Sequence, residues 1–149
     1  MELVTKYHGE IEIDEKEIIH FPQGIPGFLE EKDYVLLTLA KDSPFLVLQS
    51  TNTSELAFIS MIPWEVKSDY DFEISEQVEE LLEIEQVEDV LVVAICTMKD
   101  SLENMTINLS APVVINTKKA LAKQVIIDNS NYSIKHPVFP LEKQRQEAK

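Results

Sequence analysis

The sequence has few glycines and tryptophans, one cysteine, and no apolar run near the roughly 20 residues of a membrane-spanning helix. Because Cys96 is alone, no disulfide can form within the chain, and a reducing compartment suits such a protein. The N-terminus has no basic segment followed by an apolar core, so we expect no signal peptide and a cytoplasmic location. A chain of 149 residues can bury roughly 70% of its unfolded surface and needs no metal or disulfide to fold.

Basic residues are also scarce. Thirteen lysines and arginines stand against 27 acidic residues, which gives a formal net charge of -14. This charge repels phosphate backbones and anionic lipids, so nucleic acids and membranes are not expected as partners. It favours basic proteins, although solubility alone also explains an acidic surface.

No arrangement of side chains typical of catalysis is present. His8, His20 and His136 are scattered and lack the spacing of metal ligands. No serine lies in a nucleophile elbow, and we expect Cys96 to be a buried apolar residue rather than a nucleophile. The sequence therefore predicts neither an enzyme nor a protein with a cofactor or a metal site.

Alternating and β-branched apolar residues predict a mainly β fold. The segment from Leu3 to Ile13 has the pattern of a hairpin that turns at His8-Gly9. Further strands are expected at 17–21, 34–39, 45–49, 56–63, 90–97, 120–127 and 132–135. We expect one compact antiparallel β-barrel-like domain over residues 1–140, with a charged tail at 141–149. The two apolar runs at 45–48 and 56–59 should form the part of the sheet that is covered on both faces.

Two of the three glycines fall in the short segment from Pro22 to Phe28. Gly24 and Gly27 supply the positive φ angles of tight turns, and Pro26 fixes φ near -65°. The spacing predicts a rigid turn against which Phe21 and Phe28 fold back as plugs.

The stretch Met105–Asn116 reads M-T-I-N-L-S-A-P-V-V-I-N. Met105, Ile107 and Leu109 alternate with polar residues such as Asn108, as in a half-buried strand. Pro112 has no N–H, so regular pairing should break there before Val113–Ile115 resumes it. We expect a bent strand.

Negative charge is concentrated between Glu65 and Asp89, where eleven acidic residues accompany a single base, Lys67. Ser75 can cap a short acidic helix at about 75–84, with Val78, Leu81 and Leu82 on one apolar face. The other face is a candidate dock for a basic partner, or simply a solvated surface. The candidate acidic residues are Glu65, Asp69, Asp71, Glu73, Glu76, Glu79, Glu80 and Glu83.

Four aromatic residues are candidates for an apolar binding surface, with a place in the core as the alternative for each. They are Phe28, Trp64, Tyr70 and Phe72.

Two strings resemble the FliW family of bacterial flagellar assembly factors. F-P-x-G-I-P-G-F at 21–28 is similar to its N-terminal motif, and N-L-S-A-P-V-V-I-N at 108–116 to its hallmark. The resemblance extends to the strand that ends at Pro63 and to residues 122–137, so it covers nearly the whole chain. Gly24, Pro26, Gly27, Phe28, Asn108 and Pro112 carry the two motifs.

The resemblance implies a non-enzymatic cytoplasmic regulator, which we expect to be monomeric when free, with two mutually exclusive protein partners. One is flagellin, bound near its chain terminus and kept soluble before export. The other is CsrA, a small basic RNA-binding dimer that blocks translation of flagellin messenger RNA. When flagellin is exported, the freed protein binds CsrA and lifts the block.

Two other classes of function compete with this interpretation. Nucleic-acid-binding barrels carry basic grooves with exposed aromatics, which the net charge of -14 contradicts. A small-ligand-binding β-barrel protein of unknown ligand is the main alternative, although the dense apolar runs indicate that side chains fill the interior.

Overall fold

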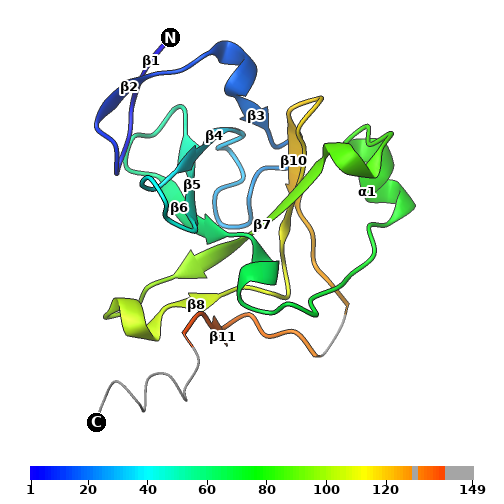
Figure 1. The fold of residues 1–149 in the computed structure, drawn as a ribbon. Helices are drawn as coiled ribbons and strands as arrows, with labels where there is room; N and C mark the ends of the chain where they lie inside the picture. The colour runs from blue at the N-terminus through cyan, green and yellow to red at the C-terminus, as the bar shows by residue number, and fades with distance from the viewer. Residues whose placement is uncertain (129–130, 140–149) are drawn as a thin grey trace.

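The computed structural model describes residues 1–128 and 131–139, and it is mainly β (Figure 1). Its strands are β1 Glu2–Val4, β2 Glu10–Glu12, β3 Ile19–His20, β4 Asp33–Thr38, β5 Phe45–Ser50, β6 Ala57–Met61, β7 Val90–Thr97, β8 Thr106–Ile107, β9 Val113–Asn116, β10 Leu121–Gln124 and β11 His136–Pro137. One short α-helix, α1 Glu76–Leu81, occurs in the described part, together with the 3₁₀ turns η1 Glu15–Glu17, η2 Pro63–Glu65, η3 Val87–Asp89 and η4 Leu102–Asn104.

Seven strands close into a barrel in the order β7-β6-β5-β4-β3-β10-β9, and β9 pairs back onto β7. The pairings are antiparallel except for one parallel contact between Leu121 and His20. This confirms the predicted barrel-like fold with one short helix. A closed barrel leaves no free edge among its seven strands, which protects them from pairing with other chains.

Large side chains fill the barrel. Phe21, Tyr34 and Leu48 are each 0% exposed, and Phe21 packs edge-to-face on Tyr34 at 5.1 Å between ring centroids. The β5–β6 run is covered less than predicted, because Phe45, Leu46 and residues 56–59 are only half-buried. Side chains thus occupy the space that an internal ligand chamber would need.

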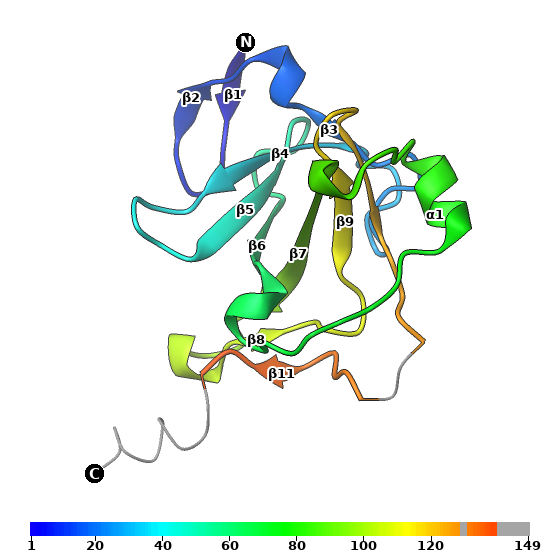
Figure 2. The ribbon, with the colours of Figure 1, turned by 45° about the vertical axis from the view of Figure 1, so that its right-hand side comes forward.

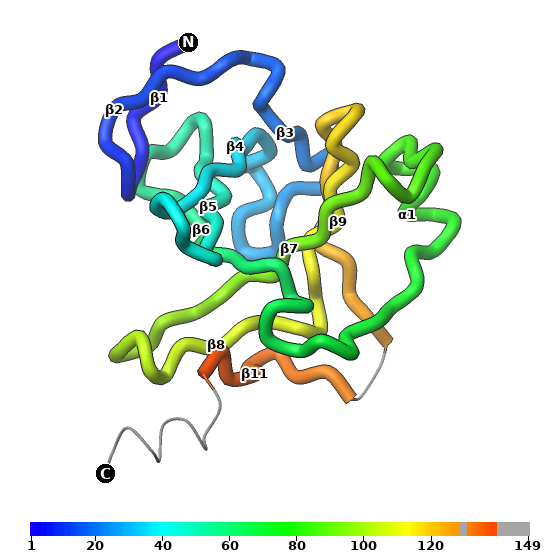
Figure 3. The backbone as a smooth tube through the Cα atoms, in the orientation of Figure 1, coloured from blue at the N-terminus to red at the C-terminus, as the bar shows by residue number. Residues whose placement is uncertain are grey.

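One two-stranded sheet lies beside the barrel, and two further strands extend the barrel sheet, because β8 pairs with β7 and β11 pairs with β8. The β1–β2 hairpin lies at one end and is visible near the N-terminus in Figure 2, while β8 and β11 lie at the opposite end. The tube in Figure 3 shows the long connection from β6 passing beneath the barrel on its way to α1.

The last strand is not where the alternation of Tyr132–Lys135 predicted it. Ser133 makes one backbone bond, as acceptor from the Leu109 N–H at 3.0 Å, and the ladder forms only at β11. Pro137 is tolerated there because β11 is an edge strand, where a missing N–H can face away from the ladder. The charged tail at 141–149 lies outside the described residues.

The bent stretch Met105–Asn116 contributes to three separate apolar clusters. Met105, Ile107 and Leu109 pack under β7, Val113 and Ile115 lie inside the barrel, and Val114 packs against α1. Regular pairing stops between β8 and β9, as Pro112 predicted. Asn108 stabilises the bend, since its Oδ1 accepts from the N–H groups of Ser110 and Ala111 at 3.1 Å each.

The turn at 22–28 forms as predicted, with φ +67° at Gly24 and +91° at Gly27. Phe21 is buried, which confirms one of the two expected plugs. Phe28 is 43% exposed and packs on Phe58 from outside, at 5.5 Å between ring centroids, so its prediction as a second plug is wrong. Ile25 of the same turn is the residue that is buried instead, at 2% exposure.

Candidate protein-binding surface

Helix α1 presents its acidic residues to solvent. The Ser75 side chain caps its start, accepting from the Val78 N–H at 3.2 Å. Val78 and Leu82 are buried against Val114 of β9, which fixes the orientation of the helix. This confirms the predicted cap and apolar face, although the regular helix spans only Glu76–Leu81.

Five glutamates meet around a shallow hollow at this helix. Together with Ile84, they line a space of about 500 Å³: Glu76, Glu79, Glu80, Glu83 and Glu85. Within residues 1–128 and 131–139, none of the five forms an ion pair. Their charges are therefore available to a basic partner.

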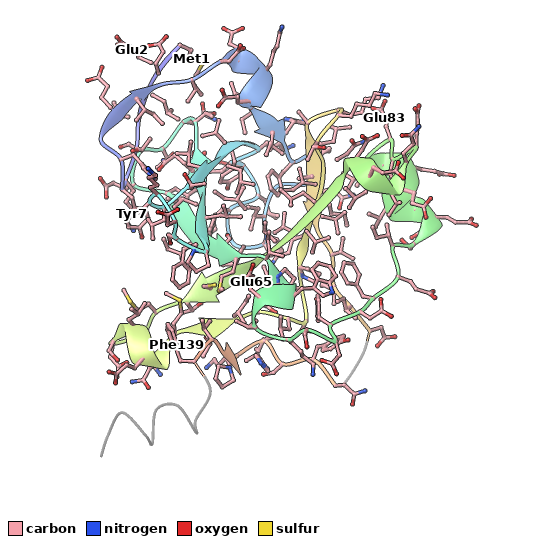
Figure 4. All side chains as sticks on the ribbon, in the orientation of Figure 1. Met1, Glu2, Tyr7, Glu65, Glu83 and Phe139 are labelled. Atoms are coloured by element: carbon pink, nitrogen blue, oxygen red, sulfur yellow. The ribbon has the colours of Figure 1, made fainter. Side chains whose placement is uncertain are left out.

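The remaining predicted acidic residues do not join this cluster as one face. Glu65 and Glu83 lie on different parts of the molecule in Figure 4. Asp69 is paired with Lys67 at 3.0 Å, and that hydrogen bond and charge hold the pKa of Asp69 below its usual value. Asp71 is exposed, and its backbone N–H donates to the Tyr132 hydroxyl at 2.9 Å.

An apolar groove adjoins the acidic residues of α1. Its first part, about 310 Å³, is lined by Ile62, Trp64, Phe72, Ile74, Val87, Val90, Leu91 and Val92. A second part, about 460 Å³, shares Phe72, Ile74, Val87 and Val90 with the first and adds Glu73, Glu79, Ile84, Glu85 and Gln86. We call these two parts together the acidic-edged groove. It combines exposed apolar side chains such as Val87, 77% exposed, with unpaired carboxylates.

Trp64 and Phe72 are the two predicted aromatics that the groove brings together. Trp64 is 40% exposed, and its indole N–H donates to the Tyr70 carbonyl at 2.6 Å. Phe72 is half-buried and packs against Tyr70.

Tyr70 and Phe28 do not belong to this groove. Tyr70 is 2% exposed and its hydroxyl donates to the Leu109 carbonyl at 2.7 Å, so its prediction as binding surface is wrong. Burial raises the pKa of its hydroxyl, as expected for a core residue. Phe28 is exposed but lies on the turn at 22–28, which lines a different part of the surface.

Asn116 is a positioning residue that was not among the predicted site residues. It is 1% exposed, and its amide donates to the carbonyls of Leu82 at 2.8 Å and Glu83 at 3.1 Å. These bonds tie the end of α1 to β9 and so fix the acidic hollow on the barrel. The only feature of the sequence that pointed to this position is an asparagine at the end of a β-branched run. The sequence did not indicate that its side chain bonds to the helix.

The structure shows no reactive arrangement at the groove. Burial raises the pKa of the Cys96 thiol to about 12, in a cluster formed with Met105 and Ile107. Among the described residues, no three His, Cys, Asp or Glu side chains are grouped as metal ligands. None of the helices described is long and apolar enough to cross a membrane.

The model of the FliW protein family matches residues 2–138. The chain belongs to the FliW family. Its relatives include proteins named flagellar assembly factor FliW from Geobacillus kaustophilus, 49% identical over 94% of this chain and 96% of theirs, and Bacillus licheniformis, 51% identical over 93% and 96%. The Bacillus subtilis protein of the same name is 48% identical over 90% of this chain and 94% of its own.

A solved structure, the crystal structure of the flagellar assembly factor FliW, has the same fold. It matches with a TM-score of 0.88 and 46% identity, over 95% of this chain and 99% of that one. Membership of the FliW family makes flagellar assembly the process in which this chain acts. The role is that of an assembly factor, by name a non-enzymatic one.

Proposed function

We propose that this protein switches between two partners: it binds flagellin in a chaperone-like way and, when free of flagellin, binds and antagonises CsrA. Family membership carries the proposal, because the resemblance to FliW implies both partners. The acidic-edged groove supports it from physical chemistry, since CsrA is a basic dimer and the groove offers carboxylates beside apolar surface.

Charge gives the groove two effects on CsrA. The glutamates of α1 attract a basic dimer over long range, which can raise the association rate about 10-fold or more at low salt. Once bound, they add negative charge near the RNA site of CsrA and disfavour RNA without occupying that site. Translation of flagellin messenger RNA is then released.

Apolar contacts give the complex its lifetime. Trp64, Phe72 and Val87 line the groove with exposed or half-buried side chains. Burying such surfaces from water lowers the dissociation rate, whereas rim charges act mainly on association.

A binding assay with both partners tests the proposal. The protein is mixed with purified CsrA, and complex formation is followed by size-exclusion chromatography before and after addition of excess flagellin. We expect a stable complex with CsrA that flagellin displaces. If the protein forms no complex with CsrA and none with flagellin, the proposal is overturned.

A further inference from the structure

A second pocket lies at one mouth of the barrel, away from the acidic-edged groove. It has a volume of about 620 Å³ and is lined by Ile25, Pro26, Phe58, Ile95, Thr97, Lys99, Asn104, Thr106, Asn108, Gln124, Ile134 and Lys135. We call it the barrel mouth. Both sequence motifs meet here, because Ile25 and Pro26 come from one and Asn108 from the other.

The barrel mouth has the opposite charge from the groove. Lys99 and Lys135 are exposed lining residues, and no aspartate or glutamate lines the pocket with them. Neither lysine forms an ion pair with any residue in the described ranges. In a protein of net charge -14, an acid-free pocket with two unpaired cations fits an anionic partner.

The mouth also offers apolar anchors. Phe58 and Ile95 lie at its base and pack against the barrel core. Ile134 is 61% exposed and lines the pocket, and Phe28, 43% exposed, packs edge-to-face on Phe58. These exposed side chains can cover the apolar face of a docked segment.

Two amides supply hydrogen bonds. Asn108 uses its Oδ1 to hold the bend, and Gln124 donates its Nε2 to the Ala111 carbonyl at 3.0 Å. Within the described residues, this leaves the Asn108 amide nitrogen and the Gln124 carbonyl oxygen without a partner. One donor and one acceptor at the same pocket suit a polypeptide.

We propose that the barrel mouth docks a peptide segment with apolar side chains and one or more carboxylates, and that it is a surface distinct from the CsrA-binding groove. The inference rests on the proposed function, within which it assigns the mouth to flagellin. Charge favours that assignment, because the two unpaired lysines disfavour basic CsrA at the mouth, whereas the glutamates of the acidic-edged groove attract it.

Separate surfaces are compatible with mutual exclusion of the partners. Val90–Val92 at the start of β7 line the groove, and Ile95 and Thr97 near its end line the mouth. Five residues of strand between Val92 and Thr97 correspond to roughly 16 Å. This is less than the roughly 30 Å width of a small domain, so partners bound at the two surfaces can exclude each other sterically.

Charge reversal of the mouth tests the inference. The variant Lys99→Glu/Lys135→Glu is compared with Lys16→Glu/Lys41→Glu, which makes the same charge change at exposed lysines outside both the pocket and the acidic-edged groove. Affinities for purified flagellin and CsrA are measured by calorimetry, with Tm as the check of folding. We expect the mouth variant to bind flagellin about 10-fold more weakly than the unmodified protein does, while its affinity for CsrA stays within about 2-fold of the unmodified value. The control variant should bind both partners as the unmodified protein does.

A second variant, Ile134→Ser, removes an apolar anchor without changing the net charge. We expect it to weaken the affinity for flagellin and to leave the affinity for CsrA unchanged. Unchanged flagellin affinity in both mouth variants would overturn the inference and leave the partner switch intact. If the unmodified protein binds neither partner, the proposed function itself fails. A loss of CsrA affinity equal to that of flagellin would also overturn the inference, because the surfaces would not be distinct.

Discussion

Gly24 and Gly27 lie in the same turn, yet their surroundings differ. Both have positive φ, but a Cβ at Gly24 would lie 2.5 Å from the Leu29 carbonyl oxygen, whereas a Cβ at Gly27 meets nothing within 4 Å. Sequence spacing predicted the left-handed angles at both. It could not predict the close approach at Gly24, because that depends on how the chain returns at Leu29.

We therefore expect Gly24→Ala to be far more destabilising than Gly27→Ala. The left-handed backbone costs each variant roughly 1–2 kcal/mol, and Gly24→Ala must also displace the Leu29 backbone. Urea unfolding should show a loss of more than about 2 kcal/mol for Gly24→Ala and about 1 kcal/mol for Gly27→Ala. Equal losses would show that the turn relaxes around the added methyl group.

Cys96 was predicted from its apolar neighbours to be a buried residue, and the structure agrees at 7% exposure. Since burial raises its pKa from 9.0 to about 12, the thiolate fraction at pH 8 falls about 1000-fold. We expect an alkylating reagent to leave the native protein unmodified at pH 8 and to label it fully in urea. Rapid labelling of the native protein would contradict the burial of this thiol.

Aromatic residues show where residue-level prediction fails. Trp64 and Tyr70 lie six positions apart, and either could have been core or surface. The fold separates them, because the Tyr70 hydroxyl reaches the Leu109 carbonyl while Trp64 stays 40% exposed beside it. Such a bond joins residues 39 positions apart, and local sequence holds no signal for it.

At the level of elements, helix α1 is held at both ends by different means. Ser75 caps its start through a local bond that the sequence predicted. Asn116 holds its end from β9, across 34 positions. Alternation and β-branched apolar runs predicted most of the strands. The last strand was misplaced, because residues 132–135 alternate but, within the described part of the chain, only Ser133 of them forms a backbone bond, and the ladder with β8 forms at β11.

The variant Asn116→Asp tests the tie between α1 and the barrel. It keeps the oxygen that accepts from the N–H groups of Lys118 and Lys119 but places a carboxylate oxygen against the Leu82 and Glu83 carbonyls. We expect a loss of about 3 kcal/mol in unfolding free energy, against about 1 kcal/mol for Ser75→Ala. If Asn116→Asp lowers the free energy of unfolding by no more than Ser75→Ala does, packing alone positions the helix.

Across the whole molecule, charge is unevenly distributed. Five unpaired glutamates gather at α1, while the barrel mouth carries two lysines and no acid. The sequence predicted the acidic concentration because those residues are contiguous. It could not predict the groove or the mouth, because each is assembled from segments that only the closed barrel brings together.

The most direct test of the central claim is the affinity for CsrA of Glu76→Lys/Glu79→Lys/Glu80→Lys, measured at several salt concentrations. The matched control is Glu2→Lys/Glu10→Lys/Glu17→Lys, which also changes the net charge from -14 to -8. These three residues are exposed and belong to the N-terminal region, and Glu2 lies far from Glu83 in Figure 4. We expect the helix variant to lose about 10-fold or more in affinity at low salt, with a flatter salt dependence, and the control to lose little. Unchanged affinity of the helix variant at every salt concentration would contradict the account.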